Sequence, residues 1–76
     1  MITVKLYGLI RIESGIKEKQ LEANSVKEAL DSLKDCGIDP KVLNGCIVLL
    51  NGKSVNKRKK LKDGDTVVLM SPVAGG

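Results

Sequence analysis

The residues with the clearest potential for chemistry stand at the end of the chain, which closes on Gly75 and Gly76. Glycine has no Cβ atom, so two glycines in succession make a thin backbone that adopts many conformations. Such a segment can enter a narrow channel and present its terminal carboxylate to an active site on another protein. We therefore expect a tail over residues 72–76. The alternative is an incidental chain end, because termini are often poorly ordered.

Catalysis by the chain itself is not expected, because the residue types that it needs are missing. The sequence has no histidine, which excludes Ser-His and Cys-His nucleophilic catalysis. Cys36 and Cys46 lack the spacing of a metal site, so no metal is predicted. We expect two packed or idle thiols, since a lone disulfide is unusual in a reducing compartment.

Two further motifs resemble functional sites without meeting their requirements. Residues 52–54 read Gly-Lys-Ser, but the phosphate-binding loop also needs a glycine at position 47, where Ile47 stands. Asp63 and Asp65 flank a glycine and are typical of turn chemistry, not of a catalytic carboxylate pair. No catalytic residue and no bound cofactor is predicted, so any ATP must be bound by a partner.

Length and composition indicate one small soluble domain, placed at residues 1–71 ahead of the tail. The chain has 76 residues, a formal net charge of +4 and no apolar run long enough to span a membrane, so a cytoplasmic protein is expected. The basic run at residues 57–60 is interpreted as a solvated loop or a contact for an acidic partner surface. A nucleic-acid partner is not expected, because the chain has one tyrosine and no Phe or Trp for base stacking.

The hydrophobic pattern predicts an α+β domain with a mixed sheet of four to five strands and one main helix on one face. Ser25 and Glu28 form a capping box that begins the helix, and Gly37 is expected to end it. Pro72 cannot donate to a sheet ladder, so pairing should end near Ser71. The expected elements are strands at 2–7, 16–23, 46–50 (a central strand) and 66–70, a helix at 25–36, a helical turn at 39–43, a connector at 9–15 and a short strand from Val55.

An apolar patch is expected on the sheet face that the helix does not cover. Side chains alternate along a strand, so strands 46–50 and 66–70 can each bury only every second residue. The remaining apolar residues would share the outer face, where an exposed apolar cluster indicates a binding surface. This set is Ile47, Leu49, Val68 and Met70. The alternative is a register shifted by one, in which these four residues form the core.

Three segments resemble the MoaD/ThiS-like sulfur carriers, a family of ubiquitin-like proteins: Asn-Gly-Lys at 51–53, Leu-Lys-Asp-Gly-Asp at 61–65 and Ser-Pro-Val-Ala-Gly-Gly at 71–76. The resemblance covers the whole chain in length and element order. It implies the β-grasp fold, in which the first and last strands lie parallel in the middle of the sheet. It also implies that the outer sheet face docks the activating enzyme.

In this family an E1-like enzyme adenylates the terminal glycine with ATP, and a sulfur donor then converts it to a thiocarboxylate. The resemblance implies that Gly76 carries the sulfur, that Gly75 is the thin approach to it, and that Val73 and Ala74 lie in the partner's channel. The chain would be a carrier or a non-catalytic subunit of a synthase, not an enzyme.

The ending favours molybdopterin over thiamine biosynthesis, with the large subunit of molybdopterin synthase as a further partner. Two alternatives stay open: a ubiquitin-like modifier joined through Gly76 to target lysines, and a plain interaction domain with an incidental tail.

Overall fold

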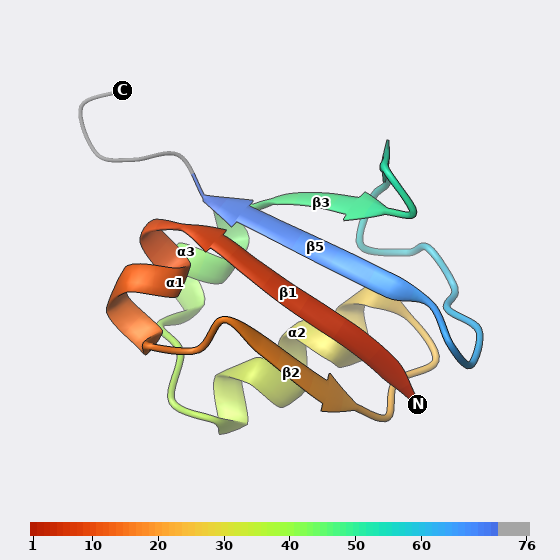
Figure 1. The fold of residues 1–76 in the computed structure, drawn as a ribbon, viewed down its shortest axis with the longest axis horizontal. Helices are drawn as coiled ribbons and strands as arrows, with labels where there is room; N and C mark the ends of the chain where they lie inside the picture. The colour runs from red at the N-terminus through yellow and green to blue at the C-terminus, as the bar shows by residue number, and fades with distance from the viewer. Residues whose placement is uncertain (72–76) are drawn as a thin grey trace.

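The computed structural model describes residues 1–71, which form one mixed sheet with its helices packed on one face (Figure 1). The strand order in the sheet is β2-β1-β5-β3-β4. The elements in chain order are β1 (Ile2–Gly8), α1 (Leu9–Ser14), β2 (Glu18–Leu21), α2 (Val26–Asp35), α3 (Pro40–Asn44), β3 (Ile47–Leu50), β4 (Lys53–Ser54) and β5 (Thr66–Ser71).

The first and last described strands meet in the centre of the sheet. β1 pairs in parallel with β5, from Thr3 opposite Thr66 to Gly8 opposite Ser71. β2 pairs antiparallel on the other side of β1, and β3 pairs antiparallel with β5. This arrangement confirms the predicted α+β class and the β-grasp topology. The described part of this ladder reaches Ser71, and the end of pairing predicted at Pro72 lies outside the described residues.

The core lies between the sheet and α2. The predicted apolar stripe of the helix is buried, with Val26 and Leu33 at 0% exposure. Facing it are the inward side chains of the central strands, and burying each large aliphatic side chain contributes about 1.5–3 kcal/mol. The fully buried large residues are Ile2, Val4, Leu6, Ile10, Val26, Leu33, Leu43, Val67 and Leu69.

Local capping fixes both ends of α2, largely as the sequence predicts. The Ser25 hydroxyl accepts a bond from the Glu28 amide at 3.2 Å, while the Glu28 carboxylate accepts from the amide of Asn24 at 3.3 Å. Gly37 has a φ of 95°, and the Ile38 amide donates back to the Leu33 carbonyl. This is the left-handed stop expected of a glycine after a helix. The turn at residues 39–43 is also helical, as α3, and the Asp39 side chain caps it.

Several predicted boundaries differ from the structure. The strand expected at 16–23 pairs only over Glu18–Leu21, although it is the predicted edge partner of β1. The return strand is Lys53–Ser54 and ends before Val55, where we expected it to begin. β3 is an interior strand as predicted, with β5 on one side and the two-residue β4 on the other. Asn51 and Gly52 both have positive φ, as the tight turn requires.

The connector expected at residues 9–15 is the helix α1. Gly8 precedes it and has no side chain to cap its free amides, so the sequence carries no helix-start signal here. A distant residue provides the cap, because the Ile10 amide donates to the buried Ser71 hydroxyl at 2.7 Å. A Cβ atom on Gly8, which has a φ of 79°, would overlap the Ser71 carbonyl oxygen. α1 therefore depends on the end of β5.

The Gly8–Ser71 junction yields a stability prediction. Gly8→Ala should lower the free energy of unfolding by at least about 2 kcal/mol, because the substitution adds overlap to a backbone conformation that costs roughly 1–3 kcal/mol for other residues. Ser71→Ala should cost about 1–3 kcal/mol by leaving a buried amide unpaired. Urea unfolding measures both. The control is Gly15→Ala, which has a φ of 72° but no atom within 4 Å of the added Cβ. Equal losses at Gly8 and Gly15 would contradict the account.

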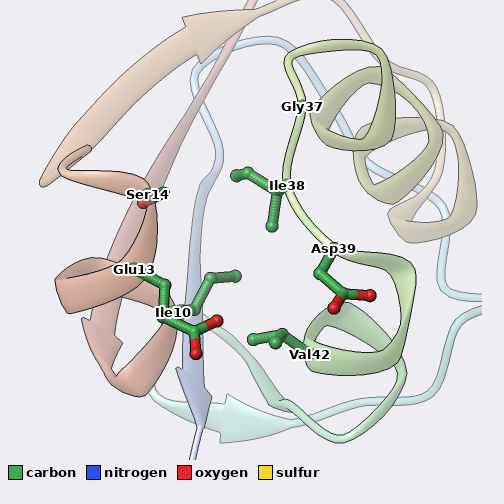
Figure 2. Close-up of a pocket in the computed structure, with 7 residues that line it drawn as sticks. All are labelled: Ile10, Glu13, Ser14, Gly37, Ile38, Asp39 and Val42. Carbon is green, nitrogen blue, oxygen red and sulfur yellow. The ribbon is translucent and has the colours of Figure 1, made fainter.

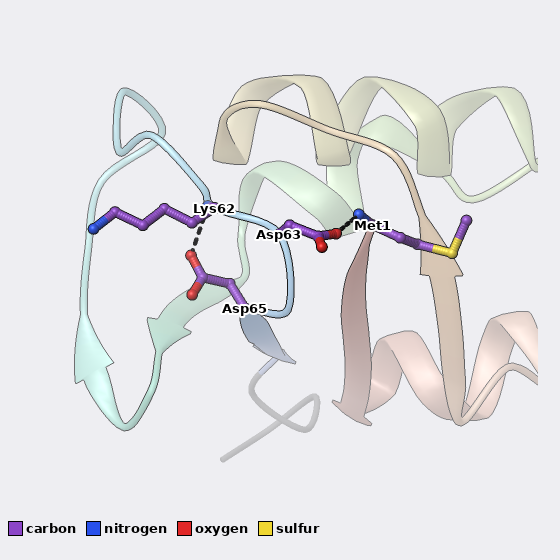
Figure 3. Close-up of polar contacts among 4 residues, drawn as sticks. All are labelled: Met1, Lys62, Asp63 and Asp65. Atoms are coloured by element: carbon purple, nitrogen blue, oxygen red, sulfur yellow. Dashed lines mark hydrogen bonds and ion pairs between the residues drawn. The ribbon is translucent and has the colours of Figure 1, made fainter.

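The turn before β5 is held by polar contacts that use both of its carboxylates (Figure 3). The Asp65 carboxylate accepts from the Lys62 amide at 2.8 Å, and the Thr3 amide donates to the Asp65 carbonyl at 3.0 Å. Asp63 binds the ammonium group of Met1. The Asp65 bond agrees with the predicted turn chemistry, whereas the Asp63 side chain contacts the first residue of the chain, 62 positions away. Hydrogen bonding to this ammonium, and then its charge, lower the pKa of Asp63 below its usual range.

This contact predicts a pH effect. Because the pKa of Asp63 is lower in the folded chain, its contribution to stability is present above the unfolded-state pKa and disappears as the pH falls through the folded-state value. Carboxyl NMR titration should find Asp63 below the ordinary aspartate range. Acetylation of the Met1 amine, which removes the charge, should return the pKa toward the usual value. An unchanged titration after acetylation would show that the ammonium group is not the cause.

Candidate functional site

The outer face of the sheet carries an apolar cluster made by three neighbouring strands. Ile47 of β3 lies directly opposite Met70 of β5, and Met70 lies opposite Tyr7 of β1. Directly paired residues point to the same side of a sheet, so these three side chains form one row. They are 51%, 41% and 40% exposed, respectively. A row of large apolar side chains in solvent is unusual for a small domain and is typical of a contact surface.

A second row lies beside the first and is half-buried. Leu49 is paired with Val68, and Val68 with Lys5. The four residues predicted for the patch, Ile47, Leu49, Val68 and Met70, therefore share the outer face in the predicted register. The alternative register is wrong, because the inward residues Val48, Leu50, Val67 and Leu69 are all buried. We call Tyr7, Ile47, Leu49, Val68 and Met70 the outer patch.

Tyr7 is the member of the patch that the sequence analysis did not select. Its signal was present, because Tyr7 follows Leu6 in a strand with clear alternation and must point away from the core. What the sequence did not supply was its neighbour. Only the parallel pairing of β1 with β5 brings Tyr7 beside Met70.

The first row of the outer patch lies next to the point where the described chain ends. Met70 precedes Ser71, and Ser71 is fixed by the Gly8 pairing and by the bond from the Ile10 amide. The predicted tail residues Val73, Ala74, Gly75 and Gly76 lie outside the described residues. A partner bound to the outer patch would thus hold the segment that leads to them.

Two hollows lie near this end of the domain. One adjoins Ser71 and is lined by Leu9, Lys41, Val42 and Gly45. The other separates α1 from the α2–α3 connection and has Ile10 and Ile38 on its walls (Figure 2). Figure 2 also shows the Glu13 and Asp39 carboxylates at this second hollow. Asp39 already caps α3 by accepting from the Lys41 amide at 2.9 Å, so its position is explained by the fold.

The side chains with nucleophilic or metal-binding potential do not gather into a site. Among residues 1–71, no group of three His, Cys, Asp or Glu side chains could hold a metal ion. Cys36 is exposed, and both cysteines are free thiols. Cys46 donates to the Val42 carbonyl at 3.1 Å, and burial raises the pKa of its thiol, which makes it a poor nucleophile. Over the same residues, no helix has the length and apolar character to cross a membrane.

Comparison with known proteins gives the same fold over nearly the whole chain. The sequence matches the model of the ThiS family over residues 4–76. No curated protein sequence matches it. Among solved structures, a protein–protein complex of subunits 1 and 2 of molybdopterin-converting factor from Helicobacter pylori contains a chain that is 30% identical. Its TM-score is 0.75, and the match covers 99% of this chain and 97% of that one.

Two further structures are similar in fold and sequence. The small archaeal modifier protein 1 of Methanosarcina acetivorans is 26% identical with a TM-score of 0.78, covering 99% of this chain and 95% of that one. A chain of the BexX/CysO complex from Amycolatopsis orientalis is 25% identical with a TM-score of 0.71, and both chains are covered completely. Because the family model matches nearly all of the sequence, the chain belongs to the ThiS family of ubiquitin-like, β-grasp sulfur carriers and modifiers.

Proposed function

We propose that this chain is a sulfur carrier whose Gly76 carboxylate is adenylated by an E1-like enzyme and then converted to a thiocarboxylate. The observation that carries the proposal is the family match, which runs through residue 76 and so includes the Gly75-Gly76 ending. The outer patch supports it, because an apolar surface beside the start of the tail suits a protein that another enzyme must grip.

The chemistry explains why a separate enzyme is needed. A carboxylate is a poor electrophile, so a nucleophile cannot displace its oxygen directly. In the proposed first step a Gly76 carboxylate oxygen attacks the α-phosphorus of ATP and pyrophosphate leaves. In the second step a sulfur donor of the hydrosulfide class attacks the carbonyl carbon, the bond to AMP breaks and AMP leaves with the electron pair. The product is a thiocarboxylate, with one oxygen replaced by sulfur and no change of carbon oxidation state.

The partners follow from the same proposal. The E1-like enzyme binds ATP and docks on the outer patch, with Val73, Ala74 and Gly75 in a channel that leads to the nucleotide. The pathway we favour is molybdopterin biosynthesis, with the synthase large subunit as the acceptor of sulfur. The support is the 30% identical chain in the Helicobacter pylori molybdopterin-converting factor complex. In this scheme the chain is a substrate and carrier, and the catalytic groups belong to its partners.

Intact mass spectrometry tests the chemistry. After incubation with ATP, an E1-like enzyme from the same cells and a sulfide donor, the chain should gain the mass of one oxygen-to-sulfur exchange, mapped to Gly76. A matched control carries an amide in place of the Gly76 carboxylate and should gain nothing. A second control, deletion of Gly75 and Gly76, should keep partner binding through the outer patch but lose the modification.

The other outcomes decide between the alternatives. Gly76 joined to a lysine in an isopeptide bond would favour a protein modifier, an alternative supported by the likeness to the small archaeal modifier protein 1. An unmodified Gly76 carboxylate after incubation with the active enzyme would contradict both the sulfur-carrier and the modifier function. An interaction domain would then be the remaining function.

The outer patch has its own test. Ile47→Asp places a charge on an exposed position, so the fold should persist while the E1-like enzyme would have to bury a carboxylate. Pyrophosphate release should then show a KM for the chain raised about tenfold or more. The control is Gln20→Asp, an exposed position on the edge strand β2 that points to the same face. An equal KM for the two variants would show that the E1-like enzyme does not dock on the outer patch.

A further inference from the structure

A second surface, near the start of β5 and away from Ser71 (Figure 1), has no role in the function proposed above. The loop after β4 folds against the first turn of α2, near the start of β5 (Figure 1). Ser71, the last described residue, lies at the other end of the same strand. A hollow between this loop and α2 is lined by four cations, Lys27, Lys57, Arg58 and Lys60. We call these four residues the basic surface.

The positive charge of the basic surface is not balanced within the described chain. None of its four cations forms an ion pair among residues 1–71. Glu28 is the one acidic residue that lines the hollow, and its carboxylate is engaged by the Asn24 amide. The exposed side chains of Lys27, Arg58 and Lys60 therefore lie together at a hollow where four cations face one carboxylate.

The location makes this clustering unfavourable for the fold. The N-terminus of a helix carries a partial positive charge, so cations are better placed at the other end. Here the basic surface surrounds the start of α2, where it adds repulsion to the helix dipole. Because this cluster of cations does not stabilise the fold, binding of a partner explains its presence better. Lys57 differs from the other three cations because its ammonium group forms a hydrogen bond within the fold, donating to the Asn44 side chain at 3.0 Å.

The contacts at the helix start restrict what the hollow can bind. The Val26 amide donates to the Lys59 carbonyl at 2.9 Å, and the Lys27 amide donates to the Lys57 carbonyl at 3.1 Å. The Glu28 amide donates to the Ser25 hydroxyl. These amides are the ones that would hold a free phosphate at a helix N-terminus, and all three are occupied. Recognition must therefore come from the mobile ends of lysine and arginine side chains.

A nucleic-acid ligand lacks its usual second contact here. Single strands are held by base stacking on aromatic side chains as well as by charge. No aromatic residue lines the hollow, and the single tyrosine, Tyr7, belongs to the outer patch. The groups that remain for binding are the lysine and arginine side chains. Carboxylates spaced along a flexible peptide are the partner groups that match them best. We infer that the basic surface docks an acidic, Asp- and Glu-rich segment of a partner protein, at a site separate from the outer patch.

Chemical-shift mapping with the full ¹⁵N-labelled chain and an oligoglutamate peptide tests this inference. Shifts should concentrate at residues 24–28 and 55–61 and leave the outer patch unchanged. Arg58→Gln with Lys60→Gln should weaken binding about two- to thirtyfold, the range for two exposed charge pairs. The matched control, Arg11→Gln with Lys17→Gln, removes one arginine and one lysine from exposed positions elsewhere and should bind as the unaltered chain does.

Three results would overturn the inference. The first is equal weakening by both double variants, which would mean that net charge alone attracts the peptide. The second is tighter binding of polyuridylate than of oligoglutamate at the same residues, which would assign the surface to nucleic acid. The third is a lower melting temperature for Arg58→Gln with Lys60→Gln, since we expect it unchanged or higher. None of these measurements depends on Gly76, so they can fail while the sulfur-carrier proposal stands, and the reverse.

Discussion

The parallel pairing of β1 with β5 is the constraint on which the rest of the molecule depends. It joins the first strand of the chain to the last and places both in the centre of the sheet. The core side chains Val4, Leu6, Val67 and Leu69 are buried only because this pairing turns them toward α2. The same pairing brings Gly8 against Ser71, which supplies the cap for α1. Contacts so distant in sequence cost loop entropy before they stabilise anything.

The position of the candidate site follows from this central pairing. A sheet covered by helices on one face leaves the other face to solvent, and alternation along β1, β3 and β5 determines which side chains appear there. In this chain they are apolar at the end of β5 that leads to the tail. In the proposed function this face would dock the partner enzyme, and the chain that continues beyond Ser71 would carry Gly76 to the partner's active site.

Charge is distributed separately from the outer patch. The loop at residues 55–61 uses its backbone carbonyls to cap α2 and its side chains to form the basic surface. The two uses do not compete, because the backbone bonds need no particular side chain. The identity of the side chains is thus free to serve recognition. The outer patch and the basic surface lie toward opposite ends of β5. A partner docked on one of them would therefore leave the other accessible to a second partner.

Local sequence alone determined the elements whose ends are fixed by nearby residues. α2 lies between Ser25 and Gly37, α3 begins at Asp39 and Pro40, and Asn51 and Gly52 form the β3–β4 turn. In each case the stabilising bond or backbone conformation lies within a few residues. Alternation along β3 and β5 divided their side chains into two sets, but it left open which set faces the core. The structure decided this by burying Val48, Leu50, Val67 and Leu69, so the four residues predicted for the outer patch are in the expected register.

Tertiary structure decided the features that depend on distant partners. α1 was not predicted, because its cap is a serine 61 residues away and its own sequence has no start signal. Of the two edge strands, β2 was predicted too long and β4 was predicted to begin too late. The ends of both depend on where the neighbouring strand stops offering hydrogen bonds. Tyr7 joined the outer patch, and Lys27 joined the basic surface, only when the folded chain brought β1 beside β5 and the loop beside α2. Spacing along a chain encodes local geometry, whereas such neighbours are set by the packing of the whole domain.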